Sequence, residues 1–135
     1  PQRVYLAGVS LGATGVLRTL AQFGNRFQGV ILISPCVDGK LSLRLCPKEP
    51  LWRGLRVLAI HGGADNRIPY SSARHGAFVY KAGGAEVTQL KYDDADHFLF
   101  FSHQDRMRSD IATWMTAPPS RAPSGDWSAG RAPEK

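Results

Sequence analysis

The stretch VYLAGVSLGATG (residues 4–15) decides the fold, because within it an apolar run passes into glycines and then into helical spacing. The apolar run has no polar alternation, which is typical of a strand buried on both faces of a sheet. After Ser10 the apolar residues recur at helical spacing, which predicts a helix over residues 11–23. A lone serine between Gly8 and Gly12 therefore lies where a buried strand must turn tightly into a helix.

Composition limits the class of protein. The 135 residues, 43% hydrophobic and 21% charged, are ordinary for one soluble globular domain. The net charge of +6 comes from scattered Lys and Arg without long basic runs, so nucleic-acid binding is not expected. No apolar segment approaches the ~18 residues of a membrane span. No CxxC or HExxH spacing occurs, so no metal site is expected.

The two cysteines, Cys36 and Cys46, bracket a loop-like segment. A disulfide between them would suit a secreted protein. A single pair gives no framework pattern, however, and two reduced thiols in a cytosolic chain are favoured. We therefore expect a cytoplasmic protein.

Apolar runs and breakers alternate along the rest of the chain. Further elements are predicted as strands at 29–34, 56–62 and 86–92 and helices at 71–82 and 103–116, after a first strand at 4–9. Ser71 or Ser72 is expected to cap the helix at 71–82, and Gly83–Gly84 to end it. The partly alternating strand at 86–92 is typical of a sheet edge. Residues 35–54 are expected to form a connection with one short helix.

The C-terminal part of the sequence changes in composition. Residues 117–135 are rich in Pro, Ser, Gly and Ala, which favours a disordered tail. The folded domain is therefore predicted to span residues 1–116.

Strand–helix–strand alternation predicts right-handed βαβ units and a mostly parallel sheet of about four strands with helices on both faces, an α/β/α three-layer fold. In such sheets ligands bind at the carboxyl ends of the strands. The four predicted strands are followed in turn by Ser10, Asp38, Asp65 and His97. A candidate nucleophile, two candidate acids and a candidate base are thus expected at one edge of the sheet.

Gly8-Val9-Ser10-Leu11-Gly12 matches the G-x-S-x-G nucleophile elbow. Such a serine is held in a strained conformation, and Cβ atoms two residues away on either side would crowd it. The backbone N–H of Leu11, at the start of the helix, is placed to donate to an oxyanion. A glycine-rich turn without catalytic role, or a phosphate-binding loop, is the alternative interpretation.

Three segments together resemble the α/β-hydrolase superfamily. LAGVSLGATG resembles its elbow, VLAIHGGADNRIP its acid-bearing segment and YDDADHFLF its histidine loop, and the likeness covers residues 3–116. The resemblance implies the C-terminal half of that fold, with Ser10 as nucleophile, Asp65 as orienting acid and His97 as general base. It implies no cofactor, and a small acyl ester or a peptide as substrate.

Other residues compete for these roles. Some members of the superfamily keep the acid after the preceding strand, which here is Asp38. His103 is the rival to His97, whereas His61 is expected in the core and His75 on a helix face. The acidic residues before His97 are expected in a solvated turn; they are Asp93, Asp94 and Asp96. The segment 98–101 is expected to anchor the histidine loop in the core.

The function predicted first is a carboxylesterase or thioesterase. A serine peptidase of prolyl oligopeptidase type is the alternative, and a catalytically incompetent hydrolase half that serves as a binding module is a third. The earlier strands and the loop that supplies a second oxyanion donor in the superfamily have no counterpart before Ser10. We therefore expect residues 1–135 alone to self-associate through an unpaired strand edge and to be a poor catalyst.

Overall fold

Strands and helices alternate along the chain, and the strands form one parallel sheet. The computed structural model describes residues 4–23, 26–36, 40, 44 and 52–119. The elements in these residues are β1 (Tyr5–Val9), α1 (Leu11–Phe23), β2 (Gly29–Ile33), β3 (Arg56–Gly62), α3 (Tyr70–Ala82), β4 (Glu86–Tyr92), α4 (Leu99–Ser102) and α5 (Gln104–Thr116). The strands are all parallel, in the order β1-β2-β3-β4. The predicted α/β class is confirmed, and the predicted strands agree with these bounds to within one residue.

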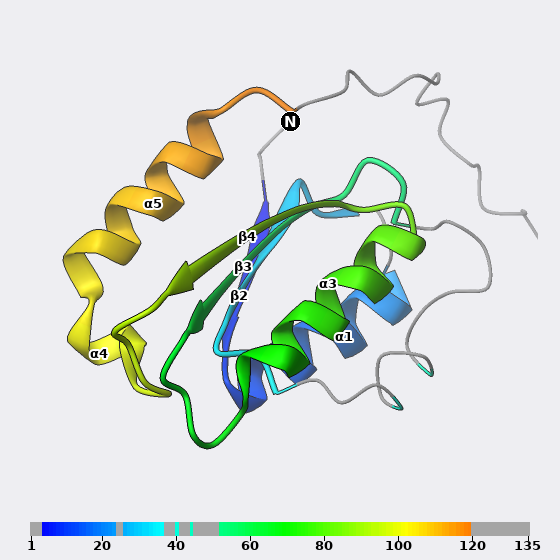
Figure 1. Cartoon of the computed structure of the whole chain (residues 1–135). Helices are drawn as coiled ribbons and strands as arrows, with labels where there is room; N and C mark the ends of the chain where they lie inside the picture. Colours follow the sequence, from blue (N-terminus) through cyan, green and yellow to red (C-terminus); the bar gives the residue numbers. More distant parts are fainter. Residues whose placement is uncertain (1–3, 24–25, 37–39, 41–43, 45–51, 120–135) are drawn as a thin grey trace, which may run out of the picture.

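Helices cover both faces of the sheet and give three layers (Figure 1). α1 and α3 lie on one face, and α5 lies on the other. Each face has its own buried cluster. The cluster on the first face includes Leu17, Leu20, Leu32, Val57 and Tyr80, and that on the second includes Ile31, Leu58, Ile60, Met107 and Trp114. β2 and β3 supply both clusters and are buried along their whole length, as their lack of polar alternation predicts.

β1 and β4 form the two edges of the described sheet. The edge position of β4 agrees with its alternating pattern. β1 differs from the prediction of burial on both faces: Gly8 is its buried residue, Ala7 is exposed, and the preceding Val4 is 45% exposed. The reason is that, among the described residues, β1 has a hydrogen-bonded neighbour on one side, β2.

The helices also depart from prediction at two places. Pro69 is the N-cap of α3, and no side-chain cap bond is made, so Ser71 and Ser72 lie inside the helix rather than capping it. Residues 99–102, expected as loop, form the short α4, which is held to the second cluster by the fully buried Leu99. α3 ends as predicted at the glycine pair, of which Gly84 has a φ of 92°.

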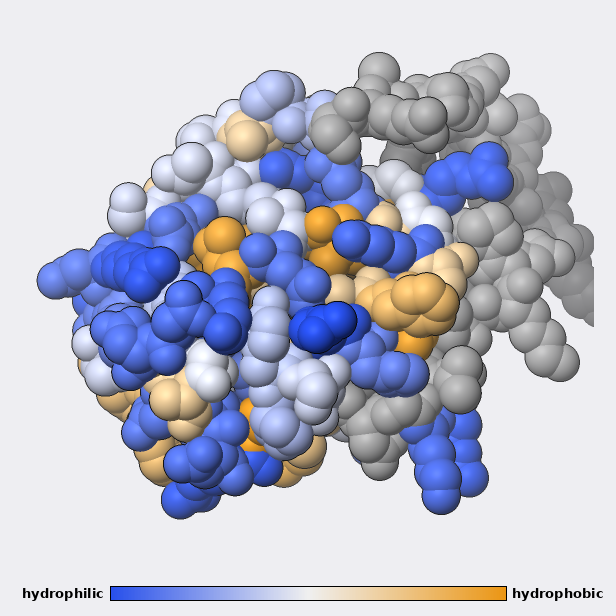
Figure 2. Space-filling model, viewed as in Figure 1, coloured by the Kyte–Doolittle hydropathy of each residue, from blue (hydrophilic) through white to orange (hydrophobic). Residues whose placement is uncertain are grey.

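Some predictions fall outside the described residues. They concern Asp38, Cys46, most of the connection at 35–54 and the tail from residue 120. Cys36 is described and is a free, exposed thiol. In the described part of the chain, no helix is both long and apolar enough to cross a membrane. Figure 2 shows that hydrophilic residues predominate on the face viewed in Figure 1, with hydrophobic ones in small separate patches, as expected of a surface facing water.

Candidate active site

Ser10 occupies the turn between β1 and α1 with a φ of 51°, a region that non-glycine residues rarely adopt. Its N–H donates to the carbonyl of Ile33 at 2.8 Å, and its carbonyl accepts the N–H of Ala13 at 3.0 Å. A Cβ on Gly8 would lie 2.5 Å from the carbonyl oxygen of Gly12. Glycine at residue 8 is therefore required by the close approach of the strand end to the first turn of α1.

Gly12 differs from Gly8. A Cβ on Gly12 would meet no atom within 4 Å in the described part of the chain. The crowding expected on both sides of Ser10 is thus present at Gly8 and absent at Gly12. Leu11 is the first residue of α1, so its N–H is one of the four that have no acceptor within the helix. Leu11 directly follows Ser10 in the chain, so this N–H belongs to the peptide that joins the two residues.

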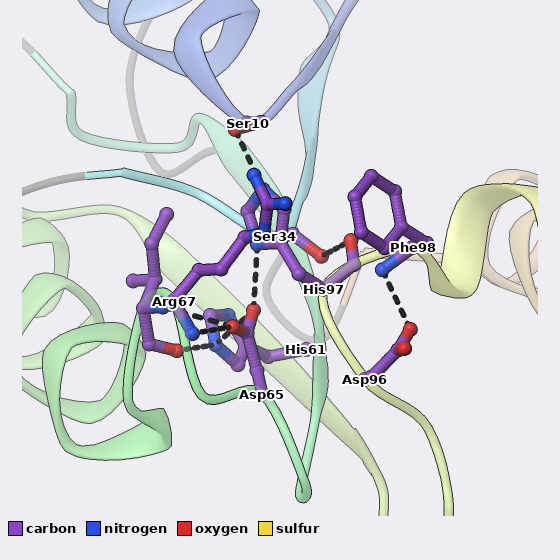
Figure 3. Close-up of polar contacts among 9 residues, drawn as sticks. Ser10, Ser34, His61, Asp65, Arg67, Asp96, His97 and Phe98 are labelled. Atoms are coloured by element: carbon purple, nitrogen blue, oxygen red, sulfur yellow. Dashed lines mark hydrogen bonds and ion pairs between the residues drawn. The ribbon is translucent and has the colours of Figure 1, made fainter.

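His97 lies in the turn between β4 and α4 and connects Ser10 to Asp65 (Figure 3). Its Nε2 is 3.0 Å from Ser10 Oγ, and its Nδ1 is 2.8 Å from Asp65 Oδ2. The His97 side chain is 12% exposed, whereas the Asp65 side chain is fully buried. Three residues that follow β1, β3 and β4 therefore form one continuous hydrogen-bonded chain, at the sheet edge where the sequence predicts them.

The environment of Asp65 fixes the proton positions in this chain. Burial raises the pKa of Asp65, but hydrogen bonds from the Ile68 N–H, from His97 and from the Arg67 N–H lower it below its usual value. The two backbone bonds, from Ile68 at 2.8 Å and Arg67 at 2.9 Å, both reach Oδ1. An ionised carboxylate only accepts hydrogen bonds, so His97 Nδ1 carries a proton. Nε2 of neutral His97 is then free to accept the Ser10 hydroxyl proton.

Ser34 supports the His97 turn, and sequence analysis did not identify it. It follows β2, has a φ of 45° and is fully buried. Its hydroxyl donates to the backbone carbonyl of His97 at 3.2 Å, and its N–H donates to Ile60 at 2.9 Å. A serine after a strand is too common to indicate this role.

Gly62, at the end of β3, brings the Asp65 turn against the His97 turn. A Cβ on Gly62 would lie 2.6 Å from the carbonyl oxygen of Asp96. The N–H of Ala64 donates to the carbonyl of Ala95 at 3.0 Å and joins the two turns. The adjacent glycines of HGGAD are a sequence signal of such a close backbone approach, one that sequence analysis did not use.

The rival histidines lie elsewhere. His103 caps α5 and contacts Asp94 at 3.4 Å and Ser102 at 2.8 Å. His75 is exposed on α3, and His61 is buried at the end of β3, as predicted. Of the four histidines, His97 is the one bonded to Ser10.

The acidic turn before His97 is exposed, as predicted. Asp93 pairs with Lys91 at 2.5 Å. Asp96 accepts the backbone N–H of Phe98 at 2.8 Å. Among the described residues, no three His, Cys, Asp or Glu side chains gather in a way that could hold a metal ion.

The segment 98–101 anchors the turn differently from the prediction. Leu99 is the buried anchor. The three phenylalanines are instead exposed: Phe98 by 46%, Phe100 by 36% and Phe101 by 68%. Within the short helix α4, Leu99 is the one buried residue, whereas the whole segment 98–101 was expected to anchor the turn in the core.

Solved structures of hydrolases share this arrangement of strands and helices. A predicted CIB-like hydrolase from Thermoplasma acidophilum matches with a TM-score of 0.66 and 16% identity, over 84% of this chain and 50% of that one. Est1E from Butyrivibrio proteoclasticus matches with a TM-score of 0.62 and 16% identity, over 84% of this chain and 60% of that one. An acylaminoacyl peptidase from Pyrococcus horikoshii matches with a TM-score of 0.64 and 15% identity, over 92% of this chain and 25% of that one.

The chain has an α/β-hydrolase fold. It forms part of that fold, because it spans between 25% and 60% of the length of these three proteins. No family model and no curated protein matches the sequence. The α/β-hydrolase likeness therefore rests on the arrangement of the strands and helices.

Proposed function

We propose that the protein is a serine hydrolase that cleaves carboxylester or thioester bonds through an acyl-enzyme on Ser10. The observation that carries the proposal is the chain of contacts from Ser10 Oγ to His97 Nε2 (3.0 Å) and from His97 Nδ1 to Asp65 Oδ2 (2.8 Å). Both distances lie within the range needed for proton transfer and for orientation of the base. These contacts lie at the carboxyl edge of the sheet, where α/β folds bind ligands.

Acylation uses the three side chains in order. His97 Nε2 takes the proton of Ser10 Oγ while Oγ bonds to the acyl carbon, and the carbonyl π electrons move onto oxygen. The Leu11 N–H at the start of α1 donates to this oxyanion. When the carbonyl re-forms, the bond to the alcohol or thiol breaks, and the leaving group takes the proton from His97.

Deacylation repeats these steps with water. Water loses its proton to His97 Nε2 and attacks the acyl carbon, and the acid then leaves as Ser10 Oγ recovers a proton. Asp65, buried and ionised, keeps the proton on His97 Nδ1 and stabilises the imidazolium in both half-reactions.

The surroundings of Ser10 and His97 support an apolar group in the substrate. Leu11 follows Ser10 directly and is 75% exposed. Phe98 follows His97, is 46% exposed, and has its ring 5.7 Å from the imidazole. The exposed Phe98 ring beside His97 offers an apolar surface that an acyl chain or an apolar leaving group could contact.

A fluorophosphonate probe tests the proposal on the complete protein. We expect covalent labelling of Ser10, located by mass spectrometry of the labelled peptide, and no labelling of the Ser10→Ala variant. Ser71→Ala changes an exposed serine on α3 and should retain full labelling. Labelling that persists in Ser10→Ala would contradict the assignment. A folded protein that is not labelled would indicate a binding module without catalytic activity.

A further inference from the structure

His61 is a buried histidine that does not belong to the hydrogen-bonded series Ser10–His97–Asp65. It lies at the end of β3 and is 1% exposed. Its Nε2 is 2.8 Å from the carbonyl oxygen of Ile68 and 3.4 Å from Asp65 Oδ2 (Figure 3). The two histidines therefore meet at the same carboxylate oxygen, His97 at 2.8 Å and His61 at 3.4 Å.

The contacts of His61 indicate which nitrogen carries the proton. Both atoms near Nε2 are acceptors, so Nε2 is the protonated donor. Nδ1 is buried and has no hydrogen-bond partner among the described residues. A proton on Nδ1 would leave a buried donor unpaired, which is unfavourable, so the contacts favour the proton on Nε2. The other titratable groups nearby are Tyr70, whose ring is 5.9 Å away, and Lys91, the register partner on β4.

The bond from His61 closes the turn that carries Asp65. The turn is held from one side by Asp65 Oδ1, which accepts the N–H groups of Arg67 and Ile68. It is held from the other side by His61, which donates to the carbonyl of Ile68. With Oδ1 occupied by two backbone donors, Oδ2 is the oxygen that remains for His97.

We propose that His61 is a positioning residue, whose Nε2–H holds the Asp65 turn so that Oδ2 faces His97 Nδ1. The inference rests on the proposed serine hydrolase function. It differs from a packing role, because it requires a hydrogen-bond donor at the position of Nε2 rather than a side chain of a given size.

Two substitutions separate these roles. His61→Gln keeps an N–H donor at about the reach of Nε2, whereas His61→Leu fills the site without a donor. His61→Asn carries its amide one bond closer to the backbone, cannot reach the Ile68 carbonyl, and repeats the test if the leucine variant does not fold. His75→Leu is the matched control, since His75 is an exposed histidine on α3.

The kinetics of fluorophosphonate labelling distinguish positioning from folding. The labelled amplitude reports the folded fraction, and the rate constant reports how well Ser10 is activated in the molecules that are folded. We expect His61→Leu to lower the rate constant by about 10- to 100-fold, in the range of an ångström-scale misplacement. His61→Gln should recover most of the rate, and His75→Leu should match the wild type.

Two results would overturn the positioning role. One is a rate constant in His61→Leu equal to that of the wild type, at whatever amplitude. The other is a glutamine variant as slow as the leucine variant, because a donor at Nε2 would then be irrelevant. Failure of the wild type to be labelled at Ser10 would instead overturn the proposed function, so the two failures are distinguishable.

Discussion

Gly8→Ala should damage both the fold and the activation of Ser10. The added Cβ would lie 2.5 Å from the carbonyl oxygen of Gly12, 2.6 Å from its carbonyl carbon and 2.7 Å from the Ala13 nitrogen. These are backbone atoms, and the contacts are about 1 Å shorter than the separation at which non-bonded atoms attract. The first turn of α1 must therefore move away from β1. Overpacking of this kind costs about 1–3 kcal/mol of the free energy of unfolding.

The same movement displaces Ser10, which lies between Gly8 and α1, from His97 Nε2. A displacement of about 1 Å is expected to lower the rate constant of fluorophosphonate labelling by about 10²-fold. Gly12→Ala is the matched control. Its added Cβ would contact no atom of the described residues within 4 Å, and alanine is more stable than glycine in a helix by about 0.5–1 kcal/mol. Urea unfolding and labelling kinetics measure the two effects. A harmless Gly8→Ala, or a Gly12→Ala that is equally damaging, would refute the steric reasoning.

Two further predictions concern Asp65. Asp65→Asn should lower kcat for a p-nitrophenyl ester by about 10⁴, as loss of the orienting acid does in serine proteases, while Asp38→Asn should leave kcat nearly unchanged; the reverse result would assign the acid to Asp38. Burial raises the pKa of Asp65, but hydrogen bonds from Ile68, His97 and Arg67 lower it below its usual value. Ionised Asp65 therefore stabilises the fold above its unfolded pKa of about 3.9, and this contribution is lost as the pH falls through the lower folded pKa. The difference in free energy of unfolding between wild type and Asp65→Asn, from urea titrations, should shrink as the pH falls below about pH 4. A difference as large at pH 2 as at pH 5 would contradict this.

β1, β2 and β3 could be predicted because each is a short, mainly apolar run, and β4 because apolar and polar residues partly alternate along it. The order of elements then required parallel strands. The burial of β1 could not be predicted in the same way, since it depends on a neighbouring strand and not on the run itself. Helix starts were also less predictable, because Pro69 and Ser71 both suit the first turn of a helix.

The positions of Ser10, Asp65 and His97 could be predicted because each residue follows a strand, and the carboxyl ends of parallel strands share one edge. The supporting contacts could not. The Ser34 bond to His97 joins residues 63 positions apart, and no local pattern marks it. The bond from His61 to Ile68 crosses an irregular turn, where the sequence has no helical or strand periodicity that could indicate the contact. The exposure of Phe98 depends on the formation of α4, which four residues are too few to signal.

Locally unfavourable features gather at the carboxyl edge of the sheet. Ser10 and Ser34 both have positive φ values, a conformation that costs on the order of 1–3 kcal/mol for a residue other than glycine. Asp65 buries a carboxylate, and His61 buries a ring nitrogen that has no described partner. A chain selected only to fold or to bind through its surface gains nothing from these features at the ends of its buried strands. These features coincide around the hydrogen bonds that link Ser10, His97 and Asp65. Their coincidence favours catalysis at Ser10 over the interpretation of the protein as an inert binding module.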